Sequence, residues 1–154
     1  MTRRRLLIAI TVLAGALLAS DVFAQGASCT ISATSVNFGS YNVFDGPALD
    51  STGTITYRCN GAANNISISL SKGLSSTYSP RLMSKGLEAL SYNLYTNAGH
   101  TNIWGDGTSG TTVYVRANPP NNSDVNLTIY GRVPSGQDVS AGTFIDTVSA
   151  TINF

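Results

Sequence analysis

The amino-acid sequence predicts an all-β protein built as an antiparallel β-sandwich. Short runs of alternating apolar and polar residues recur along the chain, and clusters of glycine, asparagine and proline separate them. No long segment repeats apolar residues at the spacing of a helix. About seven such runs, each bounded by turn residues, are typical of a sandwich of two sheets.

The expected strands follow from this alternation. Residues 29–41 predict a strand pair or one bent strand, with Gly39 at the bend. The remaining strands are expected at residues 54–59, 66–70, 90–96, 113–115, 125–131 and 144–154, where side chains of one parity are largely apolar. Residues 74–88 are irregular, because Gly73, Pro80 and Gly86 interrupt any period. We interpret them mainly as a crossover loop, with one short helical turn near Arg81 as the alternative.

The run that ends the chain is the most informative. Its apolar residues share one parity, and Asp146 is the only polar residue among them: Phe144, Val148, Ala150, Ile152 and Phe154. The opposite parity is polar except for Ile145. This pattern predicts a strand with one apolar face that ends on an aromatic residue. Such an apolar terminus is usually docked against something, so what covers this strand becomes the functional question.

The first 24 residues resemble a secretory leader. Three arginines precede an apolar run of 14 residues, Leu6 to Ala19, and Val22-Phe23-Ala24 supplies the small residues of a cleavage site. The run is shorter than the roughly 20 residues that cross a bilayer, although a membrane anchor remains the alternative. We therefore predict a signal peptide at residues 1–24 and one domain at residues 25–154, without a membrane anchor in its mature form.

The charge and the cysteine content indicate which kinds of partner and site to expect. Removing the leader leaves six basic and seven acidic residues and no basic patch, so we expect no nucleic-acid partner. In an exported protein, two cysteines predict one disulfide, between Cys29 and Cys59. A metal site would need more ligands than these cysteines and the distant His100 supply.

Candidate catalytic and binding residues are few. His100 is the only histidine and lies in a turn beside Gly99, where a solvated loop residue is expected rather than a base. There is no Gly-x-Ser-x-Gly elbow, so we predict no enzyme and no cofactor, although composition alone leaves a Ser–His–Asp arrangement open. Trp104 precedes Gly105-Asp106-Gly107, which lacks the several oxygen ligands that calcium needs. A packed tryptophan is expected there, and a surface-binding Trp104 is the alternative.

The ordered set of motifs resembles the spore coat protein U domain, which is shared by spore coat protein U and the subunits of archaic chaperone–usher pili. The matching segments span essentially the whole mature chain: residues 29–32, 38–41, 55–59, 70–83, 90–95, 104–107, 130–134 and 142–148. The resemblance implies an incomplete immunoglobulin-like sandwich that lacks its last strand. It also implies that the Cys29–Cys59 disulfide ties the first strand to the second.

The same resemblance implies partners and a location. A periplasmic chaperone, and then a strand of a neighbouring pilin-type subunit, would fill the open groove by strand addition. The edge that pairs with them would be the terminal strand, at Val148, Ala150, Ile152 and Phe154. We expect export through the Sec pathway and the periplasm, and assembly with the help of an usher into a fimbria or coat at the cell surface.

The expected N-terminus departs from the pattern of pilus subunits. After cleavage only Gln25 to Ser28 would precede Cys29, which is too short and too polar to fill a neighbour's groove. We therefore expect a subunit that accepts a strand without donating one, in a terminal or accessory position or in a coat. The alternatives are a tip adhesin that binds glycans or surfaces through Trp104 and residues 76–81, a stand-alone secreted coat or matrix protein, and a secreted hydrolase.

Overall fold

The computed structural model describes residues 26–154, so the predicted signal peptide and its cleavage site lie outside the described residues. Eight strands form in this part of the chain: β1 (Ser28–Ala33), β2 (Leu49–Asn60), β3 (Asn65–Leu70), β4 (Arg81–Lys85), β5 (Glu88–Tyr95), β6 (Tyr114–Ala117), β7 (Asp124–Val133) and β8 (Ala150–Asn153). Residues 26–154 contain no helix, and therefore none that could span a bilayer.

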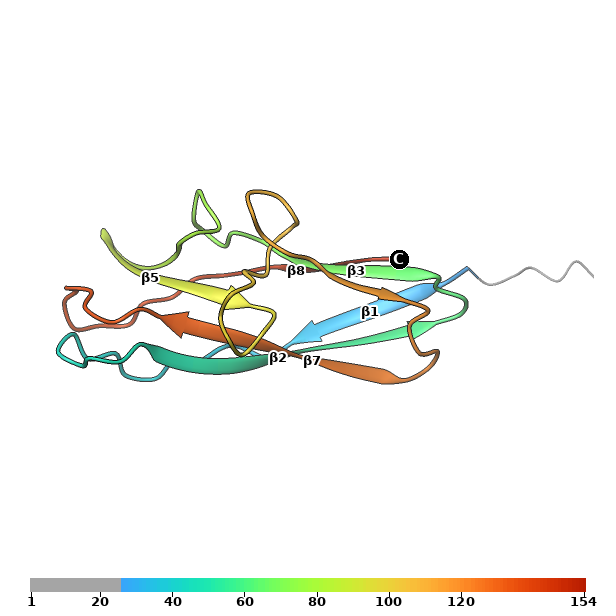
Figure 1. Ribbon diagram of the computed structural model, residues 1–154, viewed down its shortest axis with the longest axis horizontal. Coiled ribbons are helices and arrows are strands. Elements are labelled where there is room, and N and C mark those ends of the chain that lie inside the picture. The colour runs from blue at the N-terminus through green and yellow to red at the C-terminus, as the bar shows by residue number, and fades with distance from the viewer. Residues whose placement is uncertain (1–25) are drawn as a thin grey trace, which may run out of the picture.

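The strands form two antiparallel layers (Figure 1). One sheet has five strands in the order β1-β2-β7-β5-β4, and the other has three in the order β6-β3-β8. The long β2–β7 pair is the centre of the larger sheet and runs in register from Leu49↔Val133 to Arg58↔Asp124. The predicted all-β sandwich is confirmed.

The core lies between the inner faces of the two sheets. On β2, the residues of one parity are almost fully buried, with Ile55, Tyr57 and Cys59 exposed by 1% or less. On β3 the same holds for Ile66, Ile68 and Leu70, which are exposed by 3% or less. Alternation in the sequence therefore identified the inward faces of these strands correctly, because successive side chains of a strand point to opposite sides.

The disulfide forms as predicted and joins the first two strands. Cys29 and Cys59 are register partners in the β1–β2 pair, with sulfur atoms 2.10 Å apart. No free cysteine remains among residues 26–154. The bond holds the edge strand β1 to the central part of the larger sheet.

The prediction for residues 74–88 is wrong in part. They contain β4, which pairs with β5 from Arg81↔Tyr92 to Lys85↔Glu88 through a turn of Gly86 and Leu87. Gly86 has a φ of 61°, the left-handed conformation that glycine adopts most easily. The alternation was hidden because the inward side chains of β4 are Arg81 and Met83, of which the first is charged.

Candidate functional site: a groove between the first and last segments

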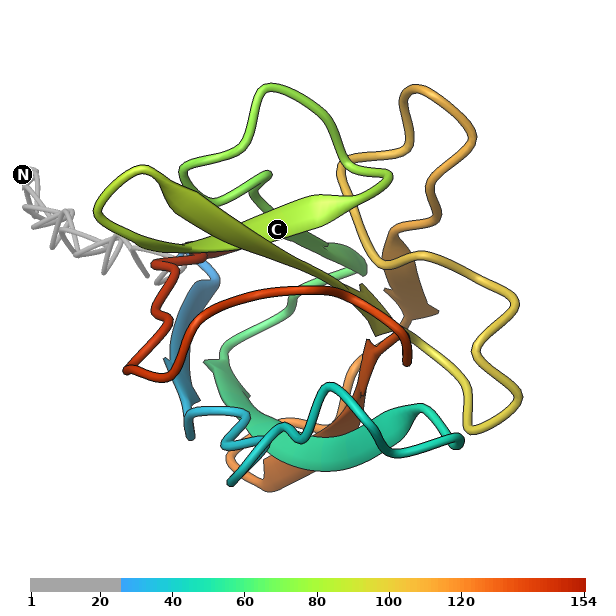
Figure 2. The same ribbon diagram turned by 90° about the vertical axis from the view of Figure 1, so that its left-hand side faces the viewer.

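A groove opens between the segment that follows β1 and the segment that precedes β8. β1 and β8 contact each other at one end of the molecule, and beyond Ala33 and Ala150 the two segments separate. The resulting space has a volume of about 1210 Å³ and is lined by residues 33–43 on one side and 139–148 on the other. Figure 2 looks along the strands from the end at which these segments are apart.

The floor of the groove is apolar. It consists of inward side chains of both sheets: Leu70, Met83, Leu90, Tyr92, Leu94, Ile129 and Val133. Each is 9% exposed or less, so the groove reaches into the core and is not a shallow surface feature. An occupant with apolar side chains would extend this core.

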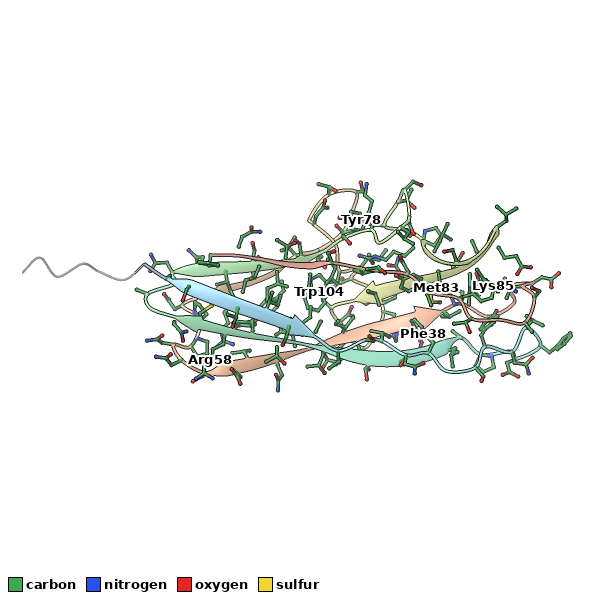
Figure 3. All side chains as sticks on the ribbon, turned by 180° about the vertical axis from the view of Figure 1, so that it is seen from behind. Phe38, Arg58, Tyr78, Met83, Lys85 and Trp104 are labelled. Carbon is green, nitrogen blue, oxygen red and sulfur yellow. A yellow bond between two sulfur atoms is a disulfide. The ribbon has the colours of Figure 1, made fainter. Side chains whose placement is uncertain are left out.

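The first side of the groove is residues 34–43, which we call the first edge. It is held at its start by a backbone hydrogen bond from Thr34 to Thr54 (2.8 Å). Farther along, Val36 packs so closely over Gly53 and Gly131 that a Cβ at either glycine would lie 2.8 Å or less from a Val36 methyl carbon. Phe38 continues this packing and meets the Tyr92 ring at 6.0 Å between centroids; Figure 3 shows Phe38 and Met83 at this end of the molecule.

The first edge carries few backbone hydrogen bonds. Asn37 C=O accepts one from the Ser51 hydroxyl (2.6 Å). Within residues 26–154, the backbone N–H and C=O groups of Val36 and Phe38 form none. These two residues are therefore packed by their side chains while their backbone stays available.

The opposite side is residues 143–149, which we call the last edge. Ile145 exchanges two backbone hydrogen bonds with Ser84 of β4 (2.8 and 3.1 Å), and Ser149 C=O accepts one from Ser71 N–H (2.9 Å). After this point β8 pairs with β3 instead, from Leu70↔Ala150 to Ser67↔Asn153. The sequence predicted one strand over 144–154; the structure shows a segment that changes its partner from β4 to β3.

Along the last edge, hydrogen bonding alternates with residue parity. Ile145 and Ser149 are bonded, whereas the backbone groups of Phe144, Asp146 and Val148 form no hydrogen bond within residues 26–154. Successive residues of an extended chain point their backbone groups to opposite sides. The three unbonded residues therefore present their N–H and C=O groups on the same side, toward the groove.

The predicted alternation of burial along this segment is confirmed up to Ile152 and is wrong for Phe154. Phe144, Asp146, Val148, Ala150 and Ile152 are half-buried, and the residues between them are exposed. Ile145 is 65% exposed and Phe154 is 58% exposed. The apolar parity faces the core up to Ile152, and the terminal aromatic residue does not.

The loop that follows β7 is anchored at the open end of the groove. Gln137 N–H donates to the Tyr41 hydroxyl (2.8 Å), and its side-chain amide bonds both backbone groups of Ser91 (2.7 and 2.9 Å). Lys85 donates to Ser140 and to Ala141 C=O. These contacts hold the start of the last edge against β4 and β5.

Asp146 is the polar residue on the inward face of the last edge. Its Oδ1 accepts hydrogen bonds from Leu74 N–H (2.8 Å) and from its neighbour Thr147 N–H (2.7 Å). Its Oδ2 accepts one from the Tyr92 hydroxyl (2.6 Å). Burial and this hydrogen bond raise the pKa of Tyr92, so the hydroxyl stays protonated and remains a donor.

A buried arginine on β4 connects three separate segments of the chain. The Arg81 side chain is 0% exposed, and its guanidinium donates to Ser71 C=O (2.9 and 3.1 Å), Trp104 C=O (2.7 Å) and Asn93 Oδ1 (2.7 Å). Burial lowers the pKa of this guanidinium. Sequence reasoning missed this residue, because a charged side chain is rarely expected in a core.

The structure does not support the alternative in which Trp104 contributes to a binding surface. Trp104 is 1% exposed and lies between the sheets (Figure 3), where its Nε1–H donates to Ile68 C=O (2.9 Å). The indole ring fills core volume, and its one polar atom has a backbone partner. The structure favours the packed tryptophan, which the sequence left as the main interpretation.

His100 is not a solvated loop residue either. Its side chain is 8% exposed and stacks edge-on against Tyr95 and Tyr130, with centroids 5.1 and 6.4 Å away. Its Nε2 lies 3.8 Å from Asp50 Oδ1, and Arg132 bonds both Asp50 oxygens at 2.7 Å. No hydrogen bond joins His100 to a serine hydroxyl within residues 26–154. The same part of the chain contains no cluster of metal-ligating side chains.

The comparisons with known proteins agree with this architecture. The family model described as the Spore Coat Protein U domain matches residues 14–151. The chain belongs to the Spore Coat Protein U domain family. It is 33% identical over 147 residues to Protein U of Myxococcus xanthus. The matched region covers 84% of this chain and 79% of that protein.

A solved structure is also similar to this chain. It is the pre-assembly complex of the chaperone CsuC and the tip adhesion subunit CsuE, from archaic chaperone–usher Csu pili of Acinetobacter baumannii. The TM-score is 0.55 at 26% identity, over 83% of this chain. This chain spans 40% of the length of the matched chain, so the likeness concerns one part of that protein.

Proposed function

We propose that this protein is a non-enzymatic structural subunit of a fimbria or surface coat, and that its groove accepts a β-strand from a partner protein. The observation that supports this most directly is that each edge of the groove has backbone N–H and C=O groups without hydrogen-bond partners. Val36 and Phe38 on one side, and Phe144, Asp146 and Val148 on the other, have backbone groups without partners in residues 26–154. An apolar floor lies between them.

A strand placed in this groove would satisfy both edges at once. Its backbone would pair with the first edge and the last edge, and its alternate side chains would point to the apolar floor. Open strand edges promote aggregation when they remain unpaired, so occupancy would also protect the protein. The last edge spans seven residues, 143–149, which corresponds to an inserted strand of about 23 Å.

The comparisons support the kind of partner. The similar tip adhesion subunit was solved with its chaperone, and we propose that a periplasmic chaperone holds this groove before a neighbouring pilin-type subunit does. Export through the Sec pathway and assembly at an usher belong to the same proposal. The predicted pairing edge was Val148, Ala150, Ile152 and Phe154; the groove-facing backbone favours a pairing edge that begins earlier, at Phe144.

A stand-alone secreted coat or matrix protein is the second candidate, because the chain resembles Protein U over most of both lengths. Such a protein would need no partner strand. The tip-adhesin alternative loses one of its proposed contacts, because Trp104 is buried. The structural subunit and the stand-alone coat protein differ in whether the groove takes up a strand.

Strand uptake is tested with two adjacent substitutions and a short synthetic peptide of alternating valine and threonine. Val148→Asp puts a charge on the groove side of the last edge, and we expect it to weaken peptide binding at least about tenfold, because the carboxylate would be buried without a partner. Thr147→Asp makes the same chemical change on the exposed face and should bind the peptide like the unchanged protein. Fluorescence titration measures both affinities.

Circular dichroism of both variants shows whether they have kept their fold. Equal peptide affinities for two folded variants would contradict strand uptake at this edge. Failure of the unchanged protein to bind any such peptide would favour the stand-alone coat protein.

A further inference from the structure

The alternation of inward and outward side chains along the last edge does not by itself determine how the segment is aligned with β4. Side chains repeat with a period of two, so a slip by two residues would keep apolar residues such as Phe144 and Val148 on the inward face. Such a slip would move the groove-facing backbone by about 7 Å while burial changed little. Another feature has to select one alignment.

The ladder hydrogen bonds are sparse at this point. The last edge bonds β4 only at Ser84↔Ile145 and joins β3 only from Ala150 onward. Between these two points, Ser71 forms two hydrogen bonds with Ser149. Ser71 N–H donates to Ser149 C=O, and Ser149 N–H donates to the Ser71 hydroxyl oxygen (both 2.9 Å). Where the segment passes from one sheet to the other, side-chain atoms therefore provide part of its hydrogen bonding.

Asp146 is the one residue here that distinguishes the alignments. Its carboxylate accepts hydrogen bonds from Leu74 N–H, Thr147 N–H and the Tyr92 hydroxyl, at 2.6 to 2.8 Å. Gly73, with a φ of 68°, makes room for it, since a Cβ at that position would overlap the carboxylate. The site is therefore shaped for an acidic side chain at this one place in the segment.

We propose that Asp146 sets the register of the last edge, and thereby the register in which the groove accepts a partner strand. A slip by two residues would bring Phe144 or Val148 to the position of Asp146. Leu74 N–H and the Tyr92 hydroxyl would then lose their acceptor. Leu74 is exposed and can bond water instead, but Tyr92 is 5% exposed, so the loss at its hydroxyl is costly. A single polar residue on an apolar face is an established way of selecting register. The second half of this proposal rests on the proposed strand uptake; the first half does not.

The alignment is tested by disulfide scanning in the full chain. Ser84→Cys is paired in turn with Ile145→Cys, Thr143→Cys and Thr147→Cys, which represent the observed alignment and the two slipped ones. In the otherwise unchanged protein we expect the 84–145 disulfide to dominate. Adding Asp146→Val, which makes the inward face uniformly apolar, should raise the yield of the slipped disulfides relative to 84–145 at least about tenfold. Asp146→Asn, which keeps one acceptor oxygen, should fall between them.

Asp106 provides the matched control. Its Oδ1 accepts two hydrogen bonds from Thr108, at 2.9 and 2.6 Å, on a loop outside the groove lining. Asp106→Asn should leave the 84–145 disulfide dominant. If Asp146→Val does not fold, Tyr92→Phe removes one of the three donors and should shift the disulfide yields in the same direction to a smaller extent.

Three results separate the claims. A dominant 84–145 disulfide in a folded Asp146→Val protein would overturn the proposal, as would unchanged yields in Tyr92→Phe. Slipped disulfides together with a tenfold weaker affinity for the valine–threonine peptide would support both halves. A peptide that fails to bind the unchanged protein would contradict the proposed function, while the alignment result would stand on its own.

Discussion

Replacing Arg81 with methionine is expected to lower the free energy of unfolding by about 3 kcal/mol or more. Methionine has a similar length and no donors, so Ser71 C=O, Trp104 C=O and Asn93 Oδ1 would each lose a hydrogen bond in the core. These acceptors belong to different elements, and Arg81 is the residue that connects them. Urea unfolding of the disulfide-bonded protein measures the loss.

Arg58 is the matched control for this substitution. Its side chain is 46% exposed and pairs with Asp124 at 3.1 Å on the outer face of the larger sheet. Arg58→Met should therefore cost less than about 1 kcal/mol, as is usual for an exposed ion pair. Similar losses for both substitutions would mean that the Arg81 network does not support the core.

Removing the disulfide is the second change with a large expected effect. Cys29 and Cys59 are separated by 30 positions in the chain, and in the chain-entropy model such a loop is worth about 3–4 kcal/mol. We expect the Cys29→Ala/Cys59→Ala protein to lose that amount in urea unfolding. Because β1 leads directly into the first edge, strand uptake should weaken as well.

The reduced form of the unchanged protein serves as the control for the cysteine substitutions. It lacks the covalent bond but keeps both sulfur atoms, so it should unfold at nearly the same urea concentration as the double variant. A difference of less than about 1 kcal/mol between the oxidised and reduced proteins would contradict the role that the loop length assigns to the bond.

The sequence was sufficient to predict which side chains face the core where buried residues alternate with exposed ones along a strand. On β2 and β3, and on the last edge, apolar residues of one parity face the core, and the alternation predicted this directly. The disulfide followed from an even number of cysteines in a chain with a leader-like N-terminus. These features depend on local pattern or on counting, and neither requires knowledge of the tertiary structure.

The sequence was insufficient where tertiary contacts override the local pattern. Arg81 faces inward because three acceptors from distant elements surround it, and this concealed β4. Asp146 was recognised as an interruption of the apolar face, but its partners Leu74 and Tyr92 come from other parts of the chain. Gly53 and Gly131 likewise serve a close approach of Val36 that only the folded structure reveals.

The central claim is that the groove accepts a strand, and amide hydrogen exchange tests it residue by residue. In the free protein we expect fast exchange at Phe144, Asp146 and Val148, and slower exchange at Ile145, which is already bonded to Ser84. Saturation with the valine–threonine peptide should protect the first three amides. Slow exchange at these amides before the peptide is added, or fast exchange in the saturated complex, would contradict the account.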